Sequence, residues 1–107
     1  MYEFDEQDWK LLRKRLPGWQ ERFMEKLLKD YAAIIAGSEN PSERFWKLEK
    51  RINKDTNLSG VIAREMKRSR MEQIIASLYR EGSINVEDLD GFSDGLVERV
   101  KLLGGSR

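Results

Sequence analysis

Apolar residues recur at intervals of three and four positions along most of this chain, the spacing that places them on one face of an α-helix. The longest series covers about residues 5–36 and keeps its phase through Pro17 and Gly18. Because proline removes an amide donor and clashes with the preceding turn, we expect one long kinked helix or two nearly collinear helices there. The members of the series are Trp9, Leu12, Leu16, Trp19, Phe23, Leu27, Tyr31, Ile34 and Ile35.

Capping signals mark both ends of this first helix. Asp5 is expected to be the N-cap, and Asp8, three residues later, to complete a weak capping box. Phe4 and Trp9 occupy the two positions of a hydrophobic staple across that cap. Gly37 suits the position that follows the last helical turn.

A second helix is predicted to begin after Asn40, because proline follows at the first helical position and glutamate at the third. This helix runs to about Lys54. Its apolar residues are Phe45, Leu48 and Ile52 on one face, with Trp46 beside them.

The next helix is predicted over residues 69–81. A turn is expected over 57–60, and residues 58–68 read as an irregular or short helical lead-in, because the apolar phase breaks there. The sequence from Ser69 to Glu72 has the form of a capping box, and Gly82 ends the helix.

A short helical turn near residues 86–90 precedes the terminal helix. Ser93 is the expected N-cap, with Phe92 and Val97 as a second hydrophobic staple. The apolar stripe of the terminal helix consists of Leu96, Val100 and Leu103.

These elements predict an all-α fold, a small antiparallel bundle of four to five helices with a long N-terminal helix. We expect a single domain over residues 1–103 and a flexible tail over 104–107. The three tryptophans, Trp9, Trp19 and Trp46, are interpreted as core anchors, and a role in gripping a partner at the surface is the alternative.

Composition restricts the chemistry that the chain can perform. Of its 107 residues 36% are charged, and no His or Cys is present, which excludes disulfides, thiolate or imidazole zinc sites and His-based nucleophilic catalysis. The chain begins with an acidic segment, and no run approaches the roughly twenty apolar residues of a membrane span. We therefore expect a cytoplasmic protein that is not an enzyme and needs no cofactor.

Basic residues at helical spacing form the most organised polar feature. They suggest a surface that contacts nucleic-acid phosphates, whereas the simpler interpretation is a solvated face with pairs such as Glu43 and Lys47. The net charge of +1 and the lack of an exposed aromatic ladder weigh against single-strand binding. The candidate residues are Lys47, Lys50, Arg51, Lys54, Arg64, Lys67, Arg68 and Arg70.

Acidic residues gather near the C-terminus without the spacing of a calcium loop, since Phe92 stands where a third ligand is needed. Acids at the starts of helices explain them more simply. We therefore assign no metal site to the group, which consists of Glu87, Asp88, Asp90 and Asp94.

The long first helix favours association with another protein. Straight, it would measure roughly 48 Å, whereas a compact domain of this size has a radius of gyration of about 13 Å. The helix either bends back at Pro17 or projects into a partner, as in a homodimer. Met24, Leu28 and Ile35 widen its apolar stripe and are the candidate dimer face.

Four segments carry a resemblance to known proteins: FDEQDWKL at 4–11, WQERFM at 19–24, PSERFWKLEKRI at 41–52 and DLDGFSD at 88–94. In them the chain resembles a group of short uncharacterised proteins from Gram-positive bacteria that often carry the label multidrug transporter. The hydropathy contradicts that label. The resemblance implies an accessory role in regulation or in binding a partner, such as a host protein, and supplies no functional residues.

Overall fold

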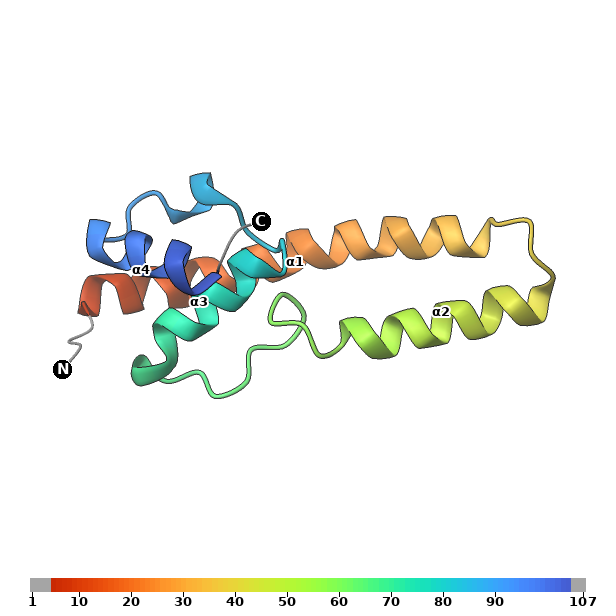
Figure 1. Cartoon of the computed structure of the whole chain (residues 1–107), viewed down its shortest axis with the longest axis horizontal. Coiled ribbons are helices and arrows are strands. Elements are labelled where there is room, and N and C mark those ends of the chain that lie inside the picture. Colours follow the sequence, from red (N-terminus) through yellow and green to blue (C-terminus); the bar gives the residue numbers. More distant parts are fainter. Residues whose placement is uncertain (1–4, 105–107) are drawn as a thin grey trace.

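The computed structural model describes residues 5–104, which form four α-helices and two short 3₁₀ helices and contain no strand (Figure 1). The elements in chain order are α1 (Glu6–Ile35), α2 (Pro41–Asp55), η1 (Arg68–Arg70), α3 (Met71–Arg80), η2 (Val86–Leu89) and α4 (Asp94–Gly104). The predicted all-α fold is confirmed. Phe4, and with it the first predicted staple, lies outside the described residues.

α1 is one uninterrupted helix of 30 residues that contains Pro17. A proline inside a helix costs one backbone hydrogen bond and introduces a steric clash. Leu16 and Trp19, on either side of it, are both buried in the same core, and Pro17 itself faces solvent. The burial of apolar side chains on both sides therefore keeps the helix continuous.

The caps of the first two helices agree with the prediction. Oδ1 of Asp5 accepts a hydrogen bond from the amide of Gln7 at 2.8 Å. Oδ1 of Asn40 accepts one from the amide of Glu43 at 2.9 Å, at the start of α2. α1 ends at Ile35, close to the predicted end near residue 36. α2 ends at Asp55, one residue beyond the predicted end at Lys54.

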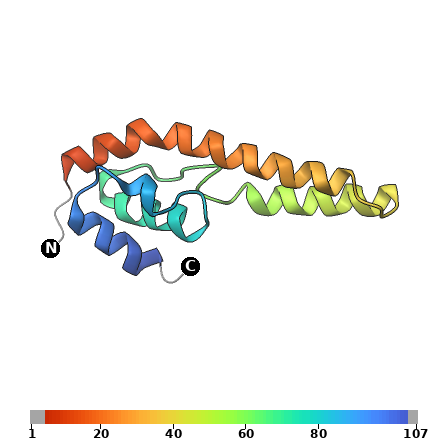
Figure 2. The same ribbon diagram turned by 90° about the horizontal axis from the view of Figure 1, so that it is seen from above.

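α2 runs antiparallel beside the distal half of α1, and the two form a helical hairpin that projects from the rest of the molecule (Figures 1 and 2). We call residues 24–55 the arm, and the other described residues, 5–23 and 56–104, the body. The structure extends over 54 × 23 × 22 Å with a radius of gyration of 16.2 Å. A compact domain of this length would have about 13 Å, so the long first helix projects instead of folding back.

The hydrophobic core lies in the body, between α1, α3 and α4. These three helices run in the same direction, so the antiparallel arrangement applies to α2 alone (Figure 2). Trp9 and Trp19 are buried there, as expected of core anchors. The largest fully buried side chains are those of Leu12, Met71, Ile75, Leu78, Ile84, Leu89, Leu96 and Val100.

Two predicted capping boxes are wrong because tertiary partners bind the carboxylates. Asp8 does not complete the first cap; it is buried and accepts hydrogen bonds from Ser93. Glu72 does not cap α3; it pairs with Arg99 of α4 at 2.6 Å. α3 instead starts from the 3₁₀ turn η1, with no side-chain cap.

The ends of α3 and α4 show two further details. α3 is closed by Gly82, whose φ of +84° lets its amide reach the carbonyl of Tyr79 at 3.2 Å. α4 includes Gly104, assigned above to the tail, and Gly104 is buried against the ring of Tyr79. Leu103, which we predicted to face the core, is half exposed. Within residues 5–104 no helix combines the length and the apolar character needed to cross a membrane.

Candidate interaction site

A polar network holds the two helices of the arm together. Asp55 of α2 is buried, and its Oδ2 accepts a hydrogen bond from the hydroxyl of Tyr31 at 2.7 Å and one from Nε of Arg51 at 2.8 Å. Arg51 also donates to Asp30 of α1 at 3.0 Å. Its guanidinium lies over the ring of Tyr31, 5.8 Å from the centroid. These contacts determine the register of α2 along α1.

The same network changes the proton affinity of its members. Burial, together with the hydrogen bond to Asp55, raises the pKa of Tyr31 to about 12. The carboxylates of Asp30 and Asp55 raise the pKa of Arg51 above its ordinary value. Tyr31 and Arg51 therefore keep their protons at neutral pH.

Large apolar side chains remain exposed on the arm. Five of them, on both helices, are between 38% and 63% exposed. Leu27, one position before the first of them, is buried at the base of the hairpin, so the exposed positions lie next to the internal contact of the arm. The five are Leu28, Ile35, Phe45, Trp46 and Ile52.

Four of these side chains form one surface across the two helices. At about 100° per residue, Leu28 and Ile35 lie within about 20° of each other around α1, as do Phe45 and Ile52 around α2. On each helix, this stripe lies roughly a quarter turn around the helix axis from the side that faces the other helix. The rotation has the same sense on α1 and on α2. Because the helices are antiparallel, equal rotations bring both stripes to the same side of the hairpin. Ile35 and Phe45 accordingly line one hollow of about 190 Å³ at the tip.

We call this surface the apolar face; it consists of Met24, Leu28, Ile35, Phe45 and Ile52. It contains all three residues of the predicted dimer face, of which Met24 is half-buried. The structure brings them together with two residues of α2 that the sequence did not assign to a contact between molecules. In the described structure no other helix covers this side of the arm (Figure 2).

Trp46 differs from the other tryptophans and corrects the prediction that all three anchor the core. It is 63% exposed, whereas Trp9 and Trp19 are 6% exposed. Its ring stands edge-to-face against Phe45, with the centroids 5.0 Å apart and the planes at 84°. Trp46 lies on the outer side of α2, next to the apolar face.

The eight predicted phosphate contacts do not form one surface. Lys47, Lys50 and Lys54 share the side of α2 opposite the apolar face. Arg51 is part of the internal network of the arm. The other four, Arg64, Lys67, Arg68 and Arg70, lie in the connection between α2 and α3.

Several of these cations have partners. Lys47 pairs with Glu39 at 3.1 Å, in place of the expected Glu43. Arg68 pairs with Glu6 at 2.6 Å, and its guanidinium lies over the ring of Trp9. The pairs of Arg51 with Asp30 and of Arg68 with Glu6 therefore attach elements of the fold to one another.

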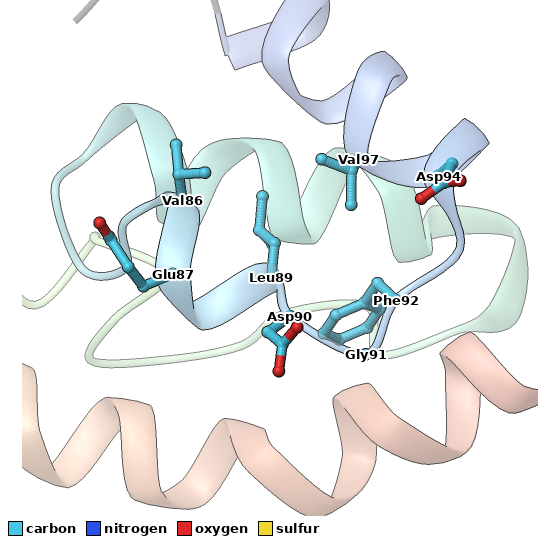
Figure 3. Close-up of a pocket in the computed structure, with 8 residues that line it drawn as sticks. All are labelled: Val86, Glu87, Leu89, Asp90, Gly91, Phe92, Asp94 and Val97. Carbon is cyan, nitrogen blue, oxygen red and sulfur yellow. The ribbon is translucent and has the colours of Figure 1, made fainter.

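Three residues of the acidic C-terminal group, Glu87, Asp90 and Asp94, line a hollow of about 560 Å³ in the body. Figure 3 shows that the side chains of Glu87, Asp90 and Asp94 point in three different directions around the hollow. Asp88 points elsewhere and pairs with Arg22 at 2.7 Å. Among residues 5–104 there is no cluster of three or more acidic side chains able to hold a metal ion.

The sequence did not predict that Phe45 and Ile52 are exposed. Their spacing shows that the helix is amphipathic, but it does not show which other element packs against its apolar face. One signal was present in the sequence. The positions of α2 that face α1 carry Arg44, Arg51 and Asp55 as well as Leu48, so the apolar stripe is displaced from the inner side of the helix.

Comparisons of the chain with protein-family models, with curated proteins and with solved structures find no match.

Proposed function

We propose that this protein is a non-catalytic interaction module that forms a homodimer through the apolar face of its arm. The observation that carries the proposal is an apolar surface shared by two helices, which no third helix covers within residues 5–104 (Figure 2). Amphipathic helices are stable when they bury such a surface against another layer. A two-helix layer that lacks its second layer is half of a four-helix bundle.

A second copy of the chain fits this surface better than an unrelated partner. A two-fold dimer needs a patch that is complementary to itself, and a flat stripe of Leu, Ile and Phe side chains meets that need. The lysines of α2, Lys47, Lys50 and Lys54, lie on the opposite side. The dimer would therefore bury apolar surface without bringing like charges together.

The body supports the non-catalytic part of the proposal. The chain contains no His and no Cys, the most common general base and the strongest nucleophile. The acids around the large hollow of the body do not converge on a common point (Figure 3). Binding is the activity that the remaining chemistry favours.

Light scattering at a series of protein concentrations tests the dimer. The wild type is expected to show twice the chain mass of 12.6 kDa, and Leu28→Ser with Phe45→Ser to show the monomer mass. The matched control is Leu102→Ser with Leu103→Ser, which removes two exposed leucines from α4 in the body. This control should remain dimeric.

Two outcomes would contradict the homodimer. The first is a wild-type protein that stays monomeric at all concentrations. The second is equal dissociation of the arm variant and the α4 control, which would place the contact elsewhere. Because all four substituted side chains are exposed, circular dichroism should show unchanged helix content in both variants.

A further inference from the structure

The outer side of α2 carries a strip of side chains that the proposed dimer leaves free. Trp46, Lys50 and Lys54 follow one another at intervals of four residues, so they stand about 6 Å apart along the helix axis. Lys47 lies beside them. The lysines lie on the side of α2 away from the apolar face, and Trp46 stands at the border of that face, where its ring packs against Phe45.

The indole of Trp46 is exposed but held in place. Its edge-to-face contact with Phe45 supports the ring on one side, and 63% of the residue remains open to solvent. Trp9 and Trp19 are buried, so Trp46 is the sole tryptophan that can meet a ligand. A fixed, open aromatic ring is suited to stacking on another planar group.

The lysines of the strip supply positive charge that the fold does not neutralise. Within the residues that the structure describes, Lys50 and Lys54 form no ion pair. Lys47 pairs with Glu39, but both side chains are exposed, and such a pair contributes little. Glu43 and Glu39 lie toward the start of α2, so the positive charge is strongest at Lys50 and Lys54.

We propose that this strip binds single-stranded nucleic acid, with one base stacked on Trp46 and phosphates contacted by Lys47, Lys50 and Lys54. Stacking aromatics beside cations are the means by which proteins bind single strands without sequence preference. A duplex keeps its bases stacked inside and offers Trp46 no free base. An acidic protein segment would contact the lysines but offers no flat ring system to the indole.

The strip has one exposed aromatic ring, not a series of rings, so the site binds only a few nucleotides. Three phosphate contacts predict that log K falls with log salt concentration with a slope of about −2. The fluorescence of Trp46 reports occupancy directly, because the other two indoles are buried. An unlabelled oligonucleotide of about ten nucleotides, within the range that one single-strand site covers, is a suitable probe.

The experiment titrates wild type with single-stranded DNA, single-stranded RNA, blunt DNA duplex and polyglutamate between about 50 and 200 mM salt. Both single strands are expected to quench the fluorescence and to bind more tightly than the duplex. Comparing DNA with RNA shows whether the 2′-hydroxyl contributes. Polyglutamate should neither quench Trp46 nor compete with the oligonucleotide.

Variants separate stacking from charge, with the anisotropy of a labelled oligonucleotide as the readout. Trp46→Leu should weaken binding about tenfold with the salt slope unchanged. Lys50→Gln with Lys54→Gln should reduce the slope from about −2 to about −0.7. Lys10→Gln with Lys14→Gln, on exposed positions of the body, removes the same charge and should leave both values unchanged.

The proposal is overturned if the duplex binds as tightly as the single strands, or if Trp46→Leu has no effect. It is also overturned if polyglutamate competes as well as the oligonucleotide, which would identify an acidic protein as the partner. Equal loss of affinity in the Lys10 and Lys14 control would show that binding follows total charge alone.

Discussion

Asp8 and Ser93 stand 85 positions apart in the chain and join the first turn of α1 to the start of α4. Oδ1 of Asp8 accepts a hydrogen bond from the amide of Ser93 at 2.8 Å, and Oδ2 accepts one from its hydroxyl at 2.6 Å. The same hydroxyl caps α4 by accepting from the amide of Leu96 at 3.4 Å. One buried carboxylate therefore determines where the last helix begins.

Removing this carboxylate should destabilise the body. Hydrogen bonds to charged groups contribute about 1.5–3 kcal/mol, so Asp8→Ala is expected to lower the free energy of unfolding by about 2–3 kcal/mol in urea titrations. Glu25→Ala, an exposed acid on the same helix, should change it by less than about 0.5 kcal/mol. Combining Asp8→Ala with Ser93→Ala should cost less than the sum of the two single substitutions. Additive effects would show that the two side chains are not coupled.

Replacing the proline inside α1 should stabilise the protein. Pro17→Ala restores an amide donor and removes a clash, a gain that the greater freedom of the unfolded chain partly offsets. We expect the free energy of unfolding to rise by about 1–3 kcal/mol. Glu21→Ala, one turn later and also exposed, serves as the control and should be nearly neutral. Loss of stability in Pro17→Ala would mean that α1 depends on the bend that proline favours.

Gly60 is expected to tolerate no side chain. An added Cβ would clash with Cδ2 of Phe23 and Oγ of Ser83, and both of these residues are buried. Gly60→Ala should therefore lower the free energy of unfolding by about 1–3 kcal/mol through overpacking. The matched control is Gly18→Ala, where nothing lies within 4 Å of the new Cβ.

Because Gly18 is inside a helix, its replacement by Ala should stabilise the protein by about 0.5–1 kcal/mol. The two glycine variants are thus expected to differ in sign in the same thermal or urea experiment. An equal effect at both positions would contradict the close packing around Gly60.

The raised pKa of Tyr31 predicts a loss of stability at alkaline pH. Its pKa is about 12 in the folded protein and about 10 in the unfolded chain, so folding retains a proton that unfolding releases. The stabilisation is fully present below about pH 10 and is lost as pH rises toward about 12. Tyr31→Phe removes this part of the pH dependence, which urea titrations over that range measure. An identical alkaline slope in wild type and Tyr31→Phe would contradict the prediction.

The hydrophobic pattern was sufficient for the elements with strong local signals. The sequence identified the N-caps Asp5 and Asn40, because their side chains bind backbone amides only two or three residues away. It also identified Gly82 at the end of α3, because a residue without a side chain readily adopts the positive φ that closes a helix. The irregular segment before η1 was also identified, because its apolar phase is broken. Where a carboxylate had a choice of partners, as at Asp8 and Glu72, the local prediction was wrong.

The sequence likewise predicted one part of the candidate interaction site and not the other. The stripe of Met24, Leu28 and Ile35 could be read from the sequence, because helical spacing depends only on the backbone. Its continuation through Phe45 and Ile52 could not, because it depends on the rotation of α2 about its own axis. The buried Asp55 sets that rotation, because it joins Tyr31 of α1 to Arg51 of its own helix through hydrogen bonds to both.

The sequence by itself determined the helices, most of their ends and the amphipathic character of each, because these follow from spacing and from capping within one or two turns. Tertiary structure alone decided which apolar side chains are covered. Trp9 and Trp19 are buried in one core with residues of α3 and α4, whereas Trp46, beside the apolar stripe of α2, has no helix over it among residues 5–104. The physical reason is that a side chain is buried only when a second surface packs against it. Local sequence determines which side chains share a helix face, but not which element covers that face.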